Sequence, residues 1–260
     1  MTPLALPEER PSEPVEALLV VPQAGGGAGV ARPLRGACPP TWLVTGVVFG
    51  GRESRFADPA PTSLDELVDD VVTAGTELAE LTGRPPVLVG QCSGGLLAWL
   101  SADRLSARGA APGGLVVVSR PAPGLAGTLP DVTAPDAEFL ADVTRLGGVP
   151  EEIAAMPELL ELLLPSLRAD FAAIGQWTAV DAQRVPPRHL PALVLHGDDD
   201  PGCTASAVRG WSEHLPGCRI NRVPGTHFLL GATPRGVAEE IAAWRGTSVP
   251  ADKEAGRCSN

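Results

Sequence analysis

Short runs of apolar residues, each ending near Gly or Pro, alternate with segments of helical periodicity along most of the chain. Such runs are typical of strands buried on both faces, and their alternation with helices is typical of parallel strands joined by crossover helices. The sequence therefore predicts an α/β fold with a mostly parallel central sheet flanked by helices. The expected strands are 17–21, 42–49, 86–89, 115–118, 193–196 and 219–223, and the expected helices include 63–81, 96–105 and 208–215.

One long stretch interrupts this alternation. Residues 121–176 contain no candidate strand, and we interpret them as a helical insertion within a single domain that spans residues 15–247. Residues 1–14 carry four Pro and are expected to form a flexible leader, and the polar residues 248–260 are expected to form a flexible tail. The helical pieces of the insertion are expected at 136–146, 150–155 and 157–164.

Composition excludes several classes of function. The formal charge is −11, from 31 acidic and 20 basic residues, which argues against binding to nucleic-acid phosphates. No apolar stretch approaches the roughly 18 residues of a membrane span, and the N-terminus lacks the basic and then apolar pattern of a secretory signal. We therefore expect a cytoplasmic monomer that has neither a membrane nor a nucleic acid as partner.

The types of residue present further limit which side chains can act in catalysis. Five Cys is an odd number, widely scattered in a chain long enough to build its own core, which favours free thiols over a disulfide framework. Lys253 is the only Lys, and Tyr is absent, so a Schiff base or a Tyr acid has almost no candidates. Ser, Cys, His and the carboxylates are the remaining catalytic side chains.

The sharpest local pattern is the segment 87–95 (VLVGQCSGG), which runs from an expected strand through a Gly-flanked turn into an expected helix. This is the context of the nucleophile elbow, G-x-S-x-G, whose flanking positions must be small because the turn is crowded. Gly90 and Gly94 occupy those positions when the motif is centred on Cys92. The segment therefore predicts Cys92 as the nucleophile.

Ser93 is the alternative nucleophile, and an elbow centred on it would carry Gln91 and Gly95 at the flanking positions. Gln at the first of these would crowd the turn, which favours Cys92. A purely structural interpretation, a buried Cys in a Gly-rich turn, competes with both.

A nucleophilic Cys needs a base, and the chain offers four His residues. His227 lies in a loop just past the last expected strand, where an α/β-hydrolase places its catalytic His. His189 lies in a Pro-flanked linker, His196 at a strand end and His214 in an expected helix, where solvated or core His residues are common. We therefore expect His227 to activate Cys92.

An Asp cluster follows the expected strand 193–196. It lies between the proposed nucleophile and His227, in the chain order that α/β-hydrolases use for their triads. Asp200 is predicted to orient His227, whereas Asp198 is expected to fix the turn through its own backbone and Asp199 to lie on the surface. A structural turn formed by the whole cluster is the competing interpretation.

A Gly-rich loop at residues 23–29 follows the first expected strand. It lacks the Lys of a phosphate-binding P-loop and the spacing of a dinucleotide fingerprint, so we expect no nucleotide cofactor. In an α/β-hydrolase this loop supplies one backbone N–H of the oxyanion hole, and the residue after the nucleophile supplies the other. We therefore expect an oxyanion hole from the amides of Ala24 and Ser93, and no metal.

These segments together resemble the type II thioesterases, stand-alone α/β-hydrolases of polyketide and nonribosomal peptide assembly lines, from about residue 20 to residue 244. The resemblance implies an α/β-hydrolase fold with a helical lid at the insertion. It also implies an acyl substrate carried as a thioester on the phosphopantetheine arm of an acyl or peptidyl carrier protein, with no further cofactor. The motifs that carry it are 22–26 (PQAGG), 51–55 (GRESR), 90–94 (GQCSG), 146–148 (LGG), 157–159 (PEL), 164–171 (LPSLRADF), 197–201 (GDDDP) and 225–228 (GTHF).

The chain departs from that family at the site itself. Cys92 replaces the usual Ser, Gln91 replaces the His before it, and Gln23 replaces the usual His or Tyr before Ala24. An acyl group on Cys92 would stay an activated thioester, so transfer or cyclisation onto an amine competes with hydrolysis as the outcome. The residues expected to line the substrate pocket are Gln23, Gln91, Met156, Trp177 and Phe228.

Two further classes of function compete with these. One is a hydrolase of small-molecule esters or lactones with the triad Cys92, Asp200 and His227. The other is a non-catalytic protein that keeps the fold and shelters a carrier-bound chain. The complete triad speaks against the second.

Overall fold

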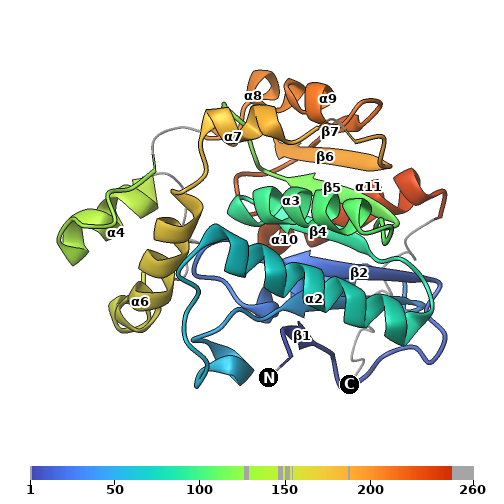
Figure 1. The fold of residues 1–260 in the computed structure, drawn as a ribbon, viewed down its shortest axis with the longest axis horizontal. Helices are drawn as coiled ribbons and strands as arrows, with labels where there is room; N and C mark the ends of the chain where they lie inside the picture. The colour runs from blue at the N-terminus through green and yellow to red at the C-terminus, as the bar shows by residue number, and fades with distance from the viewer. Residues whose placement is uncertain are drawn as a thin grey trace, which may run out of the picture.

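The central sheet is the frame of the molecule. The computed structural model describes residues 2–125, 129–145, 149, 153, 155–186 and 188–247. Within these residues, seven strands form one sheet in the order β1-β3-β2-β4-β5-β6-β7, parallel throughout except for the β1–β3 pair (Figure 1). The strands are β1 (Leu4–Ala5), β2 (Glu16–Val21), β3 (Trp42–Val47), β4 (Val87–Gln91), β5 (Gly114–Val118), β6 (Ala192–Gly197) and β7 (Arg219–Val223).

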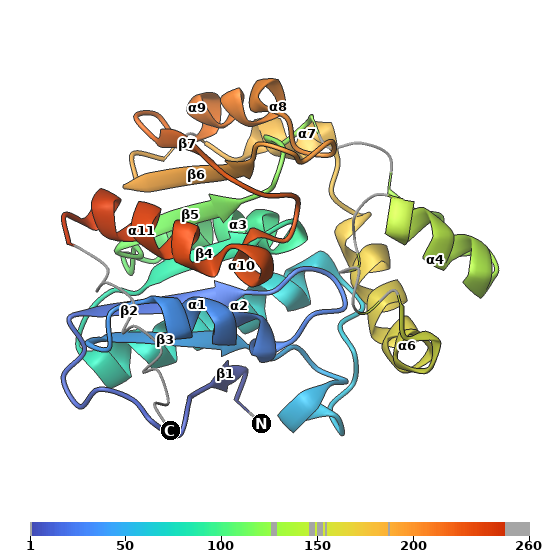
Figure 2. The same ribbon diagram turned by 180° about the vertical axis from the view of Figure 1, so that it is seen from behind.

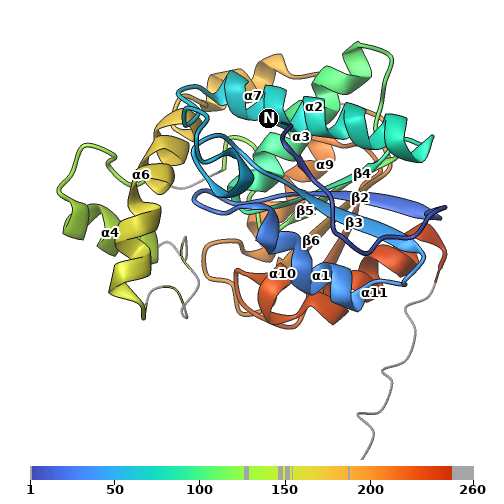
Figure 3. The ribbon, with the colours of Figure 1, turned by 90° about the horizontal axis from the view of Figure 1, so that it is seen from below.

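Helices cover both faces of this sheet, as Figure 3 shows from below. Successive side chains of a strand point to opposite faces, so Leu19 and Val21 pack toward one set of helices while Leu18 and Val20 pack toward the other. The first face carries α2 (Leu64–Thr82), α3 (Ser93–Ala107), α7 (Ala179–Arg184), α8 (Ala205–Arg209) and α9 (Trp211–His214), and the second carries α1 (Ala31–Ala37), α10 (Leu229–Ala232) and α11 (Pro234–Arg245). Short 3-10 turns lie at Ala28–Val30 and Glu53–Arg55.

The longest helix on the first face, α2, begins and ends at residues suited to helix termini. Ser63 Oγ accepts a hydrogen bond from the amide of Glu66 at 3.2 Å, which satisfies a backbone donor that has no partner within the helix. Gly83 ends the helix in the left-handed region, at φ 67°. The apolar positions between these ends pack against the sheet, so α2 joins β3 to β4 as the periodicity predicts.

Two helices of the predicted insertion, α4 (Asp136–Arg145) and α6 (Pro157–Ile174), project beyond one end of the sheet (Figures 1 and 2). The predicted helix at 157–164 is too short, because Pro165 lies inside α6 and does not end it. Leu167, Phe171 and Ile174 in the second half are buried, and this packing outweighs the backbone hydrogen bond that Pro165 cannot donate. The predicted piece at 150–155 lies mostly outside the described residues.

The leader contributes to the sheet, contrary to the expectation of a flexible segment over residues 1–14. Leu4 and Ala5 pair with Val47 and Gly46 of the edge strand β3, and the carbonyl of Pro3 accepts the Val48 amide at 2.8 Å. An unpaired β3 edge would leave its backbone groups unsatisfied, so this short strand covers it. The predicted tail, residues 248–260, lies outside the described residues, and the boundaries of the domain stay a prediction.

The predicted helix at 208–215 forms as two shorter helices. Gly210 lies between α8 and α9, and a Cβ at that position would come within 2.8 Å of Ala122. The chain between β6 and α8 contains the Asp cluster, and the chain between β7 and α10 contains His227. Both loops follow the carboxyl ends of parallel strands, β6 beside β5 and β7 beside β6, at the same edge of the sheet as the elbow.

Candidate active site

Cys92 lies at the sharp turn between β4 and α3, in a positive-φ conformation (φ 54°, ψ −123°) that non-Gly residues rarely adopt. A Cβ on Gly90 would come within 2.1 Å of the Gly94 carbonyl oxygen, and one on Gly94 within 2.2 Å of the Val21 carbonyl oxygen. Both flanking positions therefore require Gly when Cys92 is the centre. Ser93, by contrast, is already the first residue of α3.

His227 and Asp200 are joined by a short hydrogen bond. His227 Nδ1 and Asp200 Oδ2 are 2.7 Å apart, and Asp200 is only 5% exposed. The other oxygen of Asp200 accepts the amides of Gly202 and Cys203, at 2.9 and 3.1 Å. Held in this way, the carboxylate fixes the His227 ring with Nδ1 as the protonated nitrogen.

The other two Asp residues of the cluster play different parts. Asp198 accepts the amide of Gly225 at 2.8 Å, so its carboxylate holds the loop that carries His227 rather than its own turn. Asp199 is exposed, as expected. Of the three, Asp200 is the one that contacts His227.

Cys92 and His227 shift each other's pKa values in opposite directions. Burial favours the neutral Cys92 thiol and is the largest single effect on it. The positive charge of His227, a hydrogen bond with His227 and the charge of Arg120 together outweigh burial, and the pKa of Cys92 is lowered. Burial likewise favours a neutral imidazole, but the charge of Cys92 and the hydrogen bond to Asp200 raise the pKa of His227 to about 10. The two groups therefore favour a thiolate and an imidazolium, the charged state of a nucleophilic Cys with its base.

Nε2 of His227 is the ring nitrogen that is available for proton transfer. It is buried and has no hydrogen-bond partner of ordinary geometry among the described residues. Since Nδ1 is bound to Asp200, Nε2 is free to pass its proton to a reacting group. In the described part of the chain, no hydrogen bond, ion pair or ring contact joins the other three His residues to this pair, and His196 Nδ1 lies 3.1 Å from the carbonyl oxygen of Gly197.

The predicted oxyanion loop is close to the elbow, but one of its donors is already bound. The amide of Ala24 donates to Ser93 Oγ at 2.8 Å. The amide of Ser93 donates toward the Cys92 sulfur and contributes to lowering the pKa of this thiol. The side chain of Ser93 is thus a ligand of the loop, and the oxyanion role of the two amides stays a prediction.

A buried ion pair, which the sequence analysis does not assign to the site, holds the rest of this loop. Arg52 donates to both oxygens of Asp170 at 2.7 Å, and also to the carbonyl oxygen of Gly26 at 3.0 Å. Asp170 further accepts the amide of Gly25 at 2.8 Å. The pair links α6 to the oxyanion loop; the signal that could have revealed it is an Asp among the apolar residues of a helix.

The five predicted pocket residues are dispersed. The Gln91 side chain accepts the amide of Leu230 at 2.9 Å and joins β4 to α10. Trp177 packs edge-on against Trp99 with the ring centres 5.9 Å apart, and the Phe228 ring contacts the His227 ring.

Gln23 and Met156 complete that set. Gln23 is buried and its Oε1 has no partner among the described residues, whereas Met156, just before α6, is 54% exposed. Gln23, Gln91 and Phe228 are next in sequence to the predicted site residues Ala24, Cys92 and His227. The assignment of all five to an acyl pocket stays a prediction.

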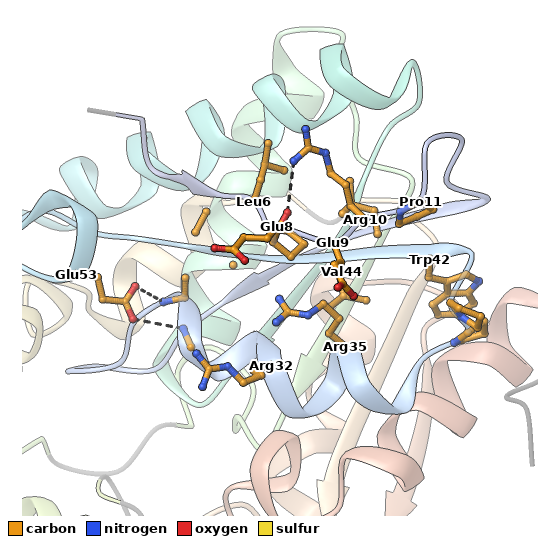
Figure 4. A pocket seen from close by; sticks show the side chains of 18 residues that line it. Leu6, Glu8, Glu9, Arg10, Pro11, Arg32, Arg35, Trp42, Val44 and Glu53 are labelled. Carbon is orange, nitrogen blue, oxygen red and sulfur yellow. Dashed lines mark hydrogen bonds between the residues drawn. The ribbon is translucent and has the colours of Figure 1, made fainter. Parts of the chain in front are cut away.

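A groove of about 1010 Å³ lies elsewhere, between residues 5–11, α1 and β3 (Figure 4). Charges of both signs line it, including Glu8, Arg32 and Arg35, and no residue of the predicted triad is among them. At one end, Glu53 accepts the amides of Ala28 and Gly29. The groove is therefore separate from the Cys92 site.

Among the described residues, no group of three or more His, Cys, Asp or Glu could hold a metal ion.

The sequence of this chain is similar to the sequences of known thioesterases. The family described as "Thioesterase domain" matches residues 16–245. "Thioesterase PikA5" of Streptomyces venezuelae is 32% identical over 228 residues, 86% of this chain and 79% of that protein. The probable cadicidin biosynthesis thioesterase of Streptomyces griseus is 31% identical, and the matched part is 86% of this chain but only 61% of that protein's length.

Solved structures agree in fold. The type II thioesterase BorB from the borrelidin biosynthetic cluster has a TM-score of 0.77 at 30% identity, over 90% of this chain and 95% of that one. The RedJ thioesterase of the prodiginine pathway in Streptomyces coelicolor has a TM-score of 0.75 at 27% identity, over 89% and 88%. These likenesses confirm the predicted α/β-hydrolase fold and the resemblance to type II thioesterases.

None of the described helices has the length and apolar character needed to cross a membrane.

Proposed function

The chain belongs to the thioesterase domain family, and from this premise we propose that it hydrolyses acyl thioesters of carrier proteins in polyketide or nonribosomal peptide biosynthesis. The reaction proceeds through an acyl group on Cys92. The observation that carries this proposal is the contact of His227 with Asp200 on one side, together with its electrostatic coupling to Cys92 at the elbow on the other. Proteins of this family need no cofactor, because the acyl group arrives already activated on its carrier.

In the first step, the Cys92 sulfur attacks the thioester carbonyl. The carbonyl oxygen becomes an oxyanion, which the amides of Ser93 and Ala24 stabilise as donors. The bond to the phosphopantetheine sulfur then breaks, and His227 gives its Nε2 proton to that sulfur. Asp200 stabilises the imidazolium until this transfer is complete.

In the second step, neutral His227 takes a proton from a water molecule as the water attacks the acyl-Cys92 carbonyl. The carbon–sulfur bond breaks, the carboxylic acid leaves, and the thiolate and the imidazolium form again. The cycle needs only the acyl thioester and water.

Intact-protein mass spectrometry after exposure to acyl-carrier thioesters tests this mechanism. The wild type and Ser93→Ala are expected to gain the mass of the acyl group, located on the peptide that contains Cys92. Cys92→Ala is expected to gain nothing, and Cys92→Ser to retain an ester. An acyl group on Cys92→Ala, or none on the wild type when the carrier thioester stays intact, would contradict the assignment.

Acyl transfer to an amine is the second candidate, and the sulfur nucleophile is the observation that favours it. Exchange of one thioester for another changes the free energy little, so acyl-Cys92 stays activated toward amines. The experiment is to add candidate amines to the acylated protein and to measure free acid and amide. Free acid alone, at saturating amine, would leave hydrolysis as the reaction.

The proposed partner is an acyl or peptidyl carrier protein, and the substrate is its acyl group. A small-molecule ester or lactone hydrolase is the further alternative, which a comparison of kcat/KM on carrier thioesters and on free esters decides. The monomeric state and the cytoplasmic location stay predictions.

A further inference from the structure

Arg120 is a buried cation beside the nucleophile that the mechanism above does not use. It follows β5 at the same edge of the sheet as the elbow, two residues after Val118, whose carbonyl accepts the Cys92 amide at 2.9 Å. Its Cβ lies 3.1 Å from the position that a Cβ on Gly95 would occupy, so its side chain leaves the backbone against the first turn of α3. Its carbonyl oxygen is fixed by Trp211 Nε1 at 2.9 Å.

The guanidinium of Arg120 has no counter-charge from a carboxylate. The residue is 8% exposed, its Nε is buried without a partner, and the described part of the chain offers it no hydrogen bond or ion pair. Arg52 is buried to a similar degree, yet it makes two bonds to Asp170. A buried charge is costly unless it is paired, so the bare guanidinium of Arg120 indicates a place for an anion.

The anionic group that faces Arg120 in the free protein is the nucleophile. Burial favours loss of the Arg120 charge and lowers its pKa, and the charges of Cys92 and Cys203 oppose this effect. Cys203 is fully buried, and burial raises the pKa of its thiol, so it stays neutral. This leaves the Cys92 thiolate as the counter-charge.

Acylation removes that counter-charge. Once Cys92 carries an acyl group its sulfur is neutral, and Arg120 then faces the acyl chain instead of a thiolate. A carboxylate on the chain would restore the pairing, and the planar guanidinium fits a carboxylate with two parallel hydrogen bonds. An apolar chain of the same shape would leave the charge unpaired.

We propose that Arg120 forms a subsite for the carboxylate of acyl chains that carry one, and that the protein prefers such chains to neutral chains of equal size. The identification of the ligand as an acyl chain rests on the proposed function. The anion subsite itself rests only on the unpaired guanidinium and its position beside Cys92.

The subsite can be tested without any thioester, by alkylating Cys92 in the full chain with anionic iodoacetate and with neutral iodoacetamide. The ratio of the two rates cancels changes in thiolate content. Arg120→Gln is expected to lower this ratio by about tenfold or more, as expected for loss of a hydrogen-bonded charge pair. Arg222→Gln, at an exposed position on β7, is the control and is expected to leave the ratio unchanged.

The acyl preference is tested with succinyl and 4-methylpentanoyl thioesters, which have nearly the same shape but differ in charge. Arg120→Gln is expected to lower kcat/KM for succinyl about tenfold more than for 4-methylpentanoyl, whose smaller loss reflects the weaker support of the Cys92 thiolate. Arg120→Lys is expected to recover part of the loss. Thermal unfolding confirms that the variants fold, and removal of a buried charge that no carboxylate pairs is not expected to lower Tm.

Three outcomes separate the two proposals. An unchanged alkylation ratio in Arg120→Gln overturns the subsite. An equal loss for both thioesters also overturns it, because Arg120 would then act on the nucleophile alone. If the wild type consumes neither thioester while the alkylation ratio still depends on Arg120, the proposed function fails and the anion subsite stands.

Discussion

At the scale of single residues, the coupling of Cys92 to His227 determines how the nucleophile responds to pH. Because the pKa of Cys92 is lowered, its thiolate is present below the pH at which a free Cys of pKa ~8.5 ionises. The alkylation rate by iodoacetamide is therefore expected to rise to its maximum at lower pH than the rate of a free thiol. His227→Ala leaves burial unopposed by an imidazolium, so its alkylation profile is expected to shift to higher pH, with at least about a tenfold loss of rate at pH 7.

The measurement is the pseudo-first-order rate of Cys92 alkylation from pH 5 to pH 10, followed on the peptide that contains Cys92. His189→Ala, in the linker before β6, is the control. A profile of the wild type that matches a free thiol would contradict the ion pair.

Ser93 gives the second prediction at this scale. Its hydroxyl accepts the Ala24 amide, which is the donor that the proposed mechanism assigns to the oxyanion. Ser93→Ala removes the competing acceptor, so the rate of acyl-Cys92 formation is expected to rise by a few-fold, as for the loss of a hydrogen bond worth about 1 kcal/mol. The buried amide then lacks a partner in the free protein, and the free energy of unfolding is expected to fall by about 1–3 kcal/mol.

Rapid-quench mass spectrometry measures the acylation rate, and thermal unfolding measures the stability. The two effects have opposite signs for one physical reason, the freeing of the Ala24 amide. A slower acylation in Ser93→Ala would mean that the hydroxyl itself assists the reaction, and would refute this account.

At the scale of elements, the ion pair between Arg52 and Asp170 connects α6 to residues 25–26 of the predicted oxyanion loop. Asp170→Asn leaves the buried Arg52 charge without compensation, so the free energy of unfolding is expected to fall by about 3–5 kcal/mol. The carboxylate also holds the Gly25 amide, so kcat is expected to fall as well. The double variant Arg52→Met, Asp170→Leu is expected to regain stability but not kcat, because it restores no ligand for the loop.

A matched control lies on the neighbouring helix. Asp136 pairs with Arg168 of α6 at 2.7 Å but is mostly exposed, and Asp136→Asn is expected to cost about 1 kcal/mol or less. Chemical denaturation and steady-state kinetics of the three variants test the comparison. A double variant with full kcat would show that the pair only stabilises the fold.

The same elements show which features of the fold and of the site can be predicted from the sequence. Strands β2, β4 and β5 each contain a continuous apolar run, and the Gly spacing around Cys92 is enough to place the elbow, because both signals are local. The strand β1 has only two residues, too few for any periodicity. The bonds of Ser93 to Ala24 and of Asp170 to Arg52 join residues 69 and 118 positions apart, so only the folded chain brings them together.

At the scale of the whole molecule, the sheet ends at β1 on one side, and this short strand is its protection. Without it, the edge of β3 would present unpaired N–H and C=O groups to other chains. Thr45 also donates its hydroxyl to the carbonyl of Ala5, so the contact involves side chain as well as backbone. Deletion of residues 2–6 is therefore expected to lower Tm and to cause association that increases with protein concentration.

Light scattering and thermal unfolding at several concentrations measure both effects. Leu4→Ala is the matched comparison, because it weakens packing but keeps the backbone pairing of β1 with β3. It is expected to lower Tm slightly without promoting association. The strand β1 lies at the opposite edge of the sheet from β7, and the site is built around β4. Acylation of Cys92 is therefore expected to persist in the monomeric fraction of the deletion variant. A monomer that is no longer acylated would mean that this edge supports the oxyanion loop through β3.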